Sequence, residues 1–182
     1  LNRRNHRLVG YSSLRSWFNF RKYKLEVFKM SQEKVHVHNK ATKTIVSSPN
    51  IYKPVGPYSQ AILVDNKTLY VSGTLGLDAQ AQLVCGGAEA ETRQALTNMK
   101  HVLEAGGASL ESVVKTTILL QDMADFQAVN QVYSEFFPKD CPARATYQVA
   151  KLPAGASVEI EAIALSGDLV VAEAGPCPCS KE

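Results

Sequence analysis

The spacing of apolar residues changes several times along the middle of the chain, and this order restricts the fold more than any other feature of the sequence. Short apolar runs at 45–46, 61–64 and 69–71 are typical of β-strands. The segment 65–67, Asp-Asn-Lys, separates the second run from the third, and these residue types favour a tight turn. We therefore predict a β-hairpin in this part of the chain.

Two later stretches have the period of amphipathic helices. The first lies between Gly87 and Gly106 and stops at the glycine pair Gly106-Gly107. The second ends before Pro138, which cannot continue a helix interior. The apolar residues of the two stripes are Ala95, Leu96, Met99, Val102 and Leu103, and then Phe126, Val129, Val132, Tyr133, Phe136 and Phe137.

A β-branched run at 113–120 separates the two helical stretches, and two further strands are predicted after the second helix. The order strands, helix, strand, helix, strands predicts a single α+β domain, in which both helices pack on one face of a mixed sheet. Apolar residues on the other sheet face need a cover, because large exposed apolar patches rarely persist. We expect identical subunits to provide this cover.

Positive charge is concentrated in the first 29 residues, which hold five Arg and three Lys against the single acid Glu26, a net charge of +7. From Met30 onward, 12 basic residues stand against 16 acidic ones, a net charge of −4. The leader has the composition of a mitochondrial transit peptide. The chain starts with Leu1 rather than Met, and Met30-Ser31 is a natural start, so we favour translated upstream sequence over a transit peptide as the origin of the leader. RNA contact is a third interpretation, although no RNA-binding module is recognisable.

We predict three segments: a basic leader at 1–29 that is disordered or not part of the mature protein, a folded domain at 30–167, and a disordered tail at 168–182. The length suits one domain with its own core. No apolar run approaches the ~20 residues of a bilayer-spanning helix. We therefore expect a soluble cytoplasmic protein, or a mitochondrial-matrix protein if the leader is native.

The four cysteines show no metal-binding or redox spacing. Cys85 and Cys141 are isolated, and a single residue separates Cys177 from Cys179, with no histidine at a metal-ligand distance along the chain. We expect neither zinc nor a structural disulfide. Reduced thiols fit a cytosolic or matrix compartment.

An arginine and two glutamates are the clearest candidates for chemistry. Arg144 opens a short β-like run, and a guanidinium can hold a planar carboxylate through two parallel hydrogen bonds. In the following run, strict alternation places Glu159 and Glu161 on one face. We expect Arg144 and the two glutamates to lie on neighbouring strands, with one glutamate beside a substrate that carries a carboxylate. The alternative is a solvated ion pair, which contributes only ~0–1 kcal/mol.

Three sequence blocks resemble the RidA/YjgF family of reactive-intermediate imine deaminases, and they occur in the family's order. The first combines Gly-Pro-Tyr-Ser-Gln-Ala from Gly56 with Leu-Tyr-Val-Ser-Gly-Thr-Leu-Gly from Leu69. The second is Phe-Gln-Ala-Val-Asn-Gln-Val-Tyr from Phe126. The third is Pro-Ala-Arg-Ala-Thr-Tyr from Pro142, followed by Val-Glu-Ile from Val158. The resemblance extends from about residue 46 to residue 167.

The resemblance implies a chorismate-mutase-like fold and a homotrimer with active sites in the clefts between subunits. It also implies hydrolysis of 2-imino acids, which form when pyridoxal-phosphate enzymes release 2-aminoacrylate or its butenoate homologue. The products would be ammonia and pyruvate or 2-oxobutanoate. The chemistry requires no metal or cofactor, because the site mainly positions substrate and water. The expected partners are the small-molecule substrate and identical subunits, without nucleic acid or membrane.

Carried over residue by residue, the resemblance makes Arg144 the ligand of the substrate carboxylate. It makes Glu159 the residue that positions and activates the hydrolytic water, while Glu161 is assigned a structural role. Some bacterial relatives have cysteine where Thr146 stands, so catalysis here cannot depend on that thiol. The structural alternatives are turn packing for Tyr58, a strand end for Ser72 and an exposed helix position for Asn130. The predicted substrate-binding residues are Tyr58, Ser72, Gly73, Asn130 and Thr146.

Two other functions stay open. Eukaryotic members of the family have been described as RNA-acting translation inhibitors. The acidic composition after the leader weighs against this function, and His36, His38 and His101 stand in no recognisable pattern for RNA cleavage. A binding or chaperone role of the trimer surface is the other possibility.

Overall fold

The structure is a computed structural model that describes residues 40–172. The predictions for the leader at 1–29, for the first residues of the domain, and for Cys177 and Cys179 lie outside the described residues. Only the beginning of the predicted tail, residues 168–172, is described, and it has no regular secondary structure.

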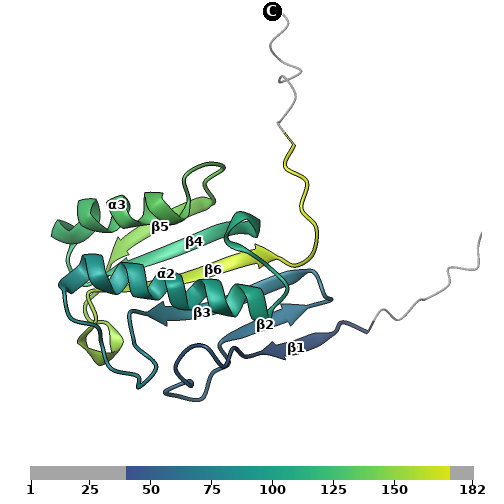
Figure 1. Ribbon diagram of the computed structural model, residues 1–182, viewed down its shortest axis with the longest axis horizontal. Helices are drawn as coiled ribbons and strands as arrows, with labels where there is room; N and C mark the ends of the chain where they lie inside the picture. The colour runs from purple at the N-terminus through teal and green to yellow at the C-terminus, as the bar shows by residue number, and fades with distance from the viewer. Residues whose placement is uncertain (1–39, 173–182) are drawn as a thin grey trace, which may run out of the picture. The chain divides into compact units, whose positions relative to one another are not determined.

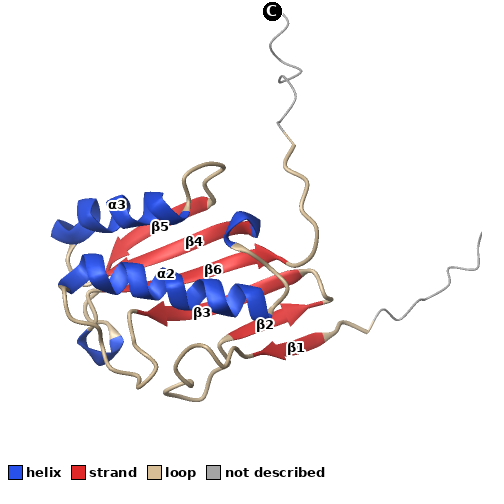
Figure 2. Cartoon of the chain, viewed as in Figure 1, coloured by secondary structure: helices blue, strands red, loops and turns tan. Residues whose placement is uncertain are grey.

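Residues 41–172 contain one six-stranded mixed sheet with two helices on one face, as Figure 1 and Figure 2 show. The strand order is β1-β2-β3-β6-β4-β5, and every neighbouring pair is antiparallel except β4 with β5. This arrangement confirms the predicted α+β class. The main elements are β1 (Lys43–Val46), β2 (Ala61–Val64), β3 (Thr68–Leu75), α2 (Gly87–Ala105), β4 (Val113–Leu120), α3 (Phe126–Phe136), β5 (Ala143–Gln148) and β6 (Val158–Leu165).

The predicted hairpin joins β2 to β3. Asp65 and Asn66 both have φ of 51°, and the Lys67 N–H donates to the Val64 carbonyl at 3.0 Å. Positive φ at both central residues is typical of the two-residue turns that match strand twist. Strand β3 is longer than predicted, because it continues to Leu75 across a register shift against β6 that includes Ser72-Gly73.

Helix α2 packs its predicted apolar stripe against the sheet, and the five stripe residues are at most 1% exposed. The Asn98 side-chain amide donates to the carbonyls of Leu75 at 3.1 Å and Leu77 at 2.8 Å. Between these two residues, a Cβ added to Gly76 would lie 2.5 Å from the Cα of Glu91. The helix backbone therefore touches the end of β3, and only glycine permits this approach.

Helix α3 covers the other part of the same face, with Val129, Val132 and Tyr133 buried. Arg93 of α2 donates hydrogen bonds to Glu135 of α3 through the two terminal nitrogens of its guanidinium, so the two helices are also linked at their surface.

The opposite sheet face lacks a covering element among the described residues. Tyr70 and Tyr147 lie on it and are 49% and 58% exposed. The expected apolar surface is present, and its burial by identical subunits stays a prediction.

Within residues 40–172, none of the helices has the length and apolar content needed to cross a membrane. Cys85 and Cys141 are both exposed free thiols.

Gly76→Ala should lower the free energy of unfolding by about 2 kcal/mol, because the new methyl group would collide with the α2 backbone. Urea unfolding at a fixed protein concentration measures this loss. Gly56→Ala is the matched control, since its Cβ would meet only the Tyr58 ring at 3.5 Å and should change stability little. Equal stability of the two variants would contradict the proposed close contact.

Candidate active site

The predicted site residues form two groups rather than one. Strand β4 lies between β5, which carries Arg144, and β6, which carries Glu159. The prediction that these residues occupy neighbouring strands is therefore wrong. β4 precedes both strands in sequence but pairs with each of them, in parallel with β5 and antiparallel with β6.

Arg144 and Glu159 also point to opposite faces of the sheet. Glu159 pairs with Leu119, which in turn pairs with Tyr147. Arg144 pairs with Thr116, an odd number of residues from Leu119 on β4. Paired residues share a face and successive residues alternate, so the guanidinium lies on the helix face and the carboxylate on the other. The two side chains cannot meet within one chain.

Arg144 lies over aromatic rings of α3. Its Cζ atom is 4.8 Å from the centroid of the Tyr133 ring and 6.0 Å from that of Phe126. A guanidinium stacked in this way keeps its edge free to bind a carboxylate. The Tyr133 hydroxyl forms a 2.8 Å hydrogen bond with the Thr116 hydroxyl, which fixes the ring beneath Arg144. Burial raises the pKa of Tyr133, against the opposing effects of Thr116 and of the Arg144 charge.

Asn130 and Thr146 belong to this arginine group. Asn130 follows Phe126 by four residues and precedes Tyr133 by three, so all three occupy one side of α3. Thr146 is two residues beyond Arg144 on the same face of β5, opposite Ile118. Both are partly buried. The structure therefore places Arg144 and Thr146 on one face of the edge strand β5, and Asn130 on the side of α3 that carries the rings beneath Arg144.

Glu159 and Gly73 form the centre of the second group. A Cβ on Gly73 would overlap the Glu159 Oε1, so the carboxylate occupies space that the side chain of any other residue would fill. The irregularity between Val71 and Thr74 places Gly73 there. Burial raises the pKa of the half-buried Glu159 carboxyl above its usual value, and the negative charge of Glu161 raises it further. Such a carboxyl is a suitable proton acceptor near neutral pH.

Ser72 and Tyr58 flank this carboxylate group. The Ser72 hydroxyl donates to the Ser59 carbonyl at 2.7 Å, and the Ser72 N–H donates to the Gln60 carbonyl at 3.0 Å. Ser72 therefore holds the segment that follows Tyr58 against the irregular part of β3. Tyr58 itself is 41% exposed, and its hydroxyl accepts the Val55 N–H at 3.3 Å.

Tyr52 is a further member of the carboxylate group that the sequence did not reveal. It is buried, and its hydroxyl accepts the Leu75 N–H at 3.2 Å. Burial is the main cause of its raised pKa, to which the nearby Tyr58 and Glu159 contribute. Tyr52 lies in the loop between β1 and β2, where no periodic spacing points to a functional residue.

The contact of Arg144 with the rings of Tyr133 and Phe126 was also missed, because the sequence indicated these two residues only as members of the apolar helical stripe. Two aromatic residues seven positions apart, with Asn130 between them, were the available signal.

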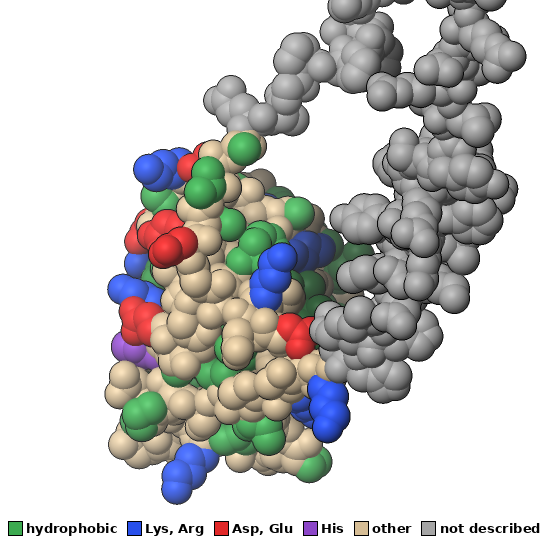
Figure 3. Space-filling view, turned by 90° about the vertical axis from the view of Figure 1, so that its right-hand side faces the viewer, with side chains coloured by type: hydrophobic (Ala, Val, Ile, Leu, Met, Phe, Trp, Pro, Cys, Tyr) green, Lys and Arg blue, Asp and Glu red, His purple; other side chains and the backbone are tan. Residues whose placement is uncertain are grey.

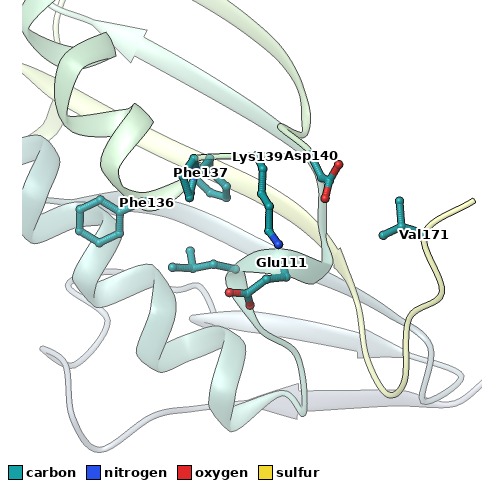
Figure 4. A pocket seen from close by; sticks show the side chains of 8 residues that line it. Glu111, Phe136, Phe137, Lys139, Asp140 and Val171 are labelled. Atoms are coloured by element: carbon teal, nitrogen blue, oxygen red, sulfur yellow. The ribbon is translucent and has the colours of Figure 1, made fainter. Parts of the chain in front are cut away.

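Figure 4 shows a pocket of about 90 Å³ at the end of α3, between Phe136, Phe137 and the side chain of Val171. It contains none of the predicted site residues. Among residues 40–172, no three His, Cys, Asp or Glu side chains are grouped so that they could hold a metal ion. We call the two groups half-sites, because each holds one of the two predicted catalytic residues, Arg144 or Glu159.

The family model described as Endoribonuclease L-PSP matches residues 47–166. The chain therefore belongs to this family, the RidA/YjgF family, as the sequence blocks indicated.

A Capra hircus protein named 2-iminobutanoate/2-iminopropanoate deaminase is 53% identical over 131 residues, which are 71% of this chain and 95% of that protein. The Homo sapiens protein of the same name is 48% identical over the same shares. The crystal structure of RidA from an Antarctic Psychrobacter species has a TM-score of 0.64 and 41% identity, and covers 67% of this chain and 98% of its own.

Glu161→Gln should lower the pKa of Glu159, because it removes the neighbouring like charge that helps to raise this pKa. The pKa should stay above the usual glutamate value, since burial is the larger cause and is unchanged. An NMR titration of the Glu159 carboxyl carbon measures the effect. Glu104→Gln, on the surface of α2, should leave it unaltered, and an unchanged pKa in Glu161→Gln would exclude the charge coupling.

Proposed function

We propose that the protein hydrolyses 2-imino acids such as 2-iminopropanoate and 2-iminobutanoate to 2-oxo acids and ammonia, the reaction class named for its relatives. The observation that carries the proposal is the pair of half-sites. One offers an aromatic-stacked guanidinium for a carboxylate, and the other offers a carboxyl with a raised pKa. A 2-imino acid needs both, because its carboxylate lies next to the carbon that water attacks.

In the proposed mechanism, Arg144 binds the substrate carboxylate and fixes the imine carbon. Glu159 accepts a proton from water as the water oxygen forms a bond to that carbon, and it passes this proton to the imine nitrogen, which gives a carbinolamine. Glu159 then takes the proton of the new hydroxyl and delivers it to the nitrogen as the C–N bond breaks, so the ketone forms and ammonia leaves. Both protons of water end on nitrogen and its oxygen in the ketone, and no oxidant or reductant is required.

We also propose that the half-sites complete one another between subunits of a homotrimer with the chorismate-mutase-like arrangement. Arg144 and Glu159 lie on opposite faces of one sheet, so a single substrate can reach both only if they come from different chains. The exposed Tyr70 and Tyr147 on the helix-free face support burial by an identical subunit. Asn130 and Thr146 would then contribute from the Arg144 chain, and the Gly73 backbone from the Glu159 chain.

RNA cleavage remains the alternative because the matching family model carries an endoribonuclease description. Residues 40–172 hold 10 Lys and Arg against 13 Asp and Glu. On the face shown in Figure 3, positive and negative side chains are interspersed and form no basic stripe. Phosphate binding normally requires such a stripe, so we favour the imino acid as substrate.

We assign the deaminase unit to residues 30–167, with the leader and the tail at 168–182 outside it. We also propose a cytoplasmic location, or the mitochondrial matrix if the leader is native.

Arg144→Ala should abolish acceleration of 2-oxo acid release from imines that a threonine or serine dehydratase generates, and hydrazone trapping measures that release. Arg144→Lys should lower kcat/KM by about 10- to 100-fold, because an ammonium cannot form the bidentate pair. Lys151→Ala, at an exposed position after β5, is the control. Equal, negligible rates with wild type and Arg144→Ala would reject the enzyme function, and RNA or protein binding would then be tested first.

Co-expression of Arg144→Ala and Glu159→Gln chains should restore activity that neither variant has alone. With random assembly, about a quarter of the sites receive Arg144 from one chain and Glu159 from another. The mixed protein should therefore reach about a quarter of wild-type activity in the same assay. No recovery in mixed trimers, verified by native mass spectrometry, would place both residues in one chain's site.

A further inference from the structure

A glutamate of helix α2 is buried at the start of β6. Glu91 is only 3% exposed. Its Oε2 accepts the Ser157 N–H at 2.6 Å, and its Oε1 accepts the Ser157 hydroxyl at 3.0 Å. No Lys, Arg or His of the described residues forms a salt bridge with it. A buried carboxylate without a cationic partner is unusual, since burial penalises charged groups.

The residue that Glu91 holds leads directly into the functional strand. Ser157 immediately precedes β6 and stands two residues before Glu159. Its carbonyl also accepts the Gln121 N–H at 2.9 Å, so both sides of its backbone are fixed. The turn before it contains Ala154 with φ of 56°, a conformation that alanine rarely adopts. The conformation at the start of β6 therefore depends on the two hydrogen bonds from Ser157 to Glu91, which we call the anchor, rather than on the backbone preferences of the local residues.

The same helix also holds β3, the strand that pairs with β6 at Glu159. Asn98 lies two turns after Glu91 on the same side of α2, and it binds the carbonyls on both sides of Gly76. The Glu91 backbone contacts Gly76 itself. Helix α2 thus holds the end of β3 and the start of β6 through neighbouring contacts.

These contacts control the position of the Glu159 carboxylate. Leu75, held by Asn98, pairs directly with Glu159, and Gly73 leaves the space that the carboxylate occupies. We propose that Glu91 is a positioning residue for Glu159: it holds the β6 backbone so that the carboxylate stays over Gly73, without contacting the substrate. This role rests on the proposed imine hydrolysis.

Glu91→Leu and Glu91→Gln separate anchoring from general packing. Glu91→Leu fills the site but accepts no hydrogen bond, so kcat should fall about 10- to 100-fold through misplacement of Glu159. KM should change less than about threefold, because Arg144 is untouched. The acid limb of the kcat/KM pH profile should also move, since the burial of Glu159 changes. Glu91→Gln can still accept the Ser157 N–H and should keep activity within about threefold. Glu89→Leu, exposed on the same helix, is the matched control.

A second measurement tests the anchor without activity. Hydrogen exchange of residues 157–161 should be about tenfold faster in Glu91→Leu than in wild type, while the core of α2 stays protected. Ser157→Ala keeps the backbone hydrogen bond and should cause a smaller increase, which covers the case in which Glu91→Leu fails to fold.

Unchanged kcat, pH profile and exchange in folded Glu91→Leu would overturn the inference, as would equal damage from Glu91→Gln. If the wild type is inactive but hydrogen exchange of residues 157–161 is faster in Glu91→Leu as expected, only the proposed reaction is rejected.

Discussion

The insertion of β4 between β5 and β6 determines where the two predicted catalytic side chains, Arg144 and Glu159, lie relative to each other. Because β4 pairs with both strands, Arg144 and Glu159 are separated by a full strand and by the thickness of the sheet. A chain in which β5 and β6 paired directly could bring an arginine and a glutamate together as an ordinary ion pair. The observed order prevents this. It leaves each group free for a ligand, and in the proposed function the association of subunits would complete the site.

The separation also matters for the chemistry of each group. Within one chain, Arg144 lies too far from Glu159 to lower the pKa of its carboxyl or to pair with it. Instead, burial and Glu161 raise that pKa, while aromatic rings rather than a carboxylate surround Arg144. The substrate carboxylate would then be the partner that Arg144 lacks in the free chain. The Arg144 charge would then be neutralised only when the substrate binds.

The sequence was informative where local rules decide the structure. The hairpin turn, the two helical stripes and the alternation of Glu159 and Glu161 follow from residue types and spacing within one element. The strand order did not follow, because pairing between distant segments depends on how α2 and α3 pack on one face. For the same reason, Ser72-Gly73 could be taken for a strand end, whereas the irregular pairing with β6 carries the strand through it. Tyr133 fitted a core stripe so well that its contact with Arg144 went unpredicted.

The least predictable features are those in which a residue acts through backbone that is distant in sequence. Gly73 matters because of the carboxylate that occupies the space above it, and Gly76 matters because of a helix that lies against it. Glutamate on a helix usually faces solvent, yet Glu91 is buried and accepts hydrogen bonds from Ser157, 66 residues away. All three contacts converge on the ends of β3 and β6. In this proposal, the position of the Glu159 carboxylate depends on how α2 packs on the sheet, so one helix would set both the core packing and the proposed catalytic geometry.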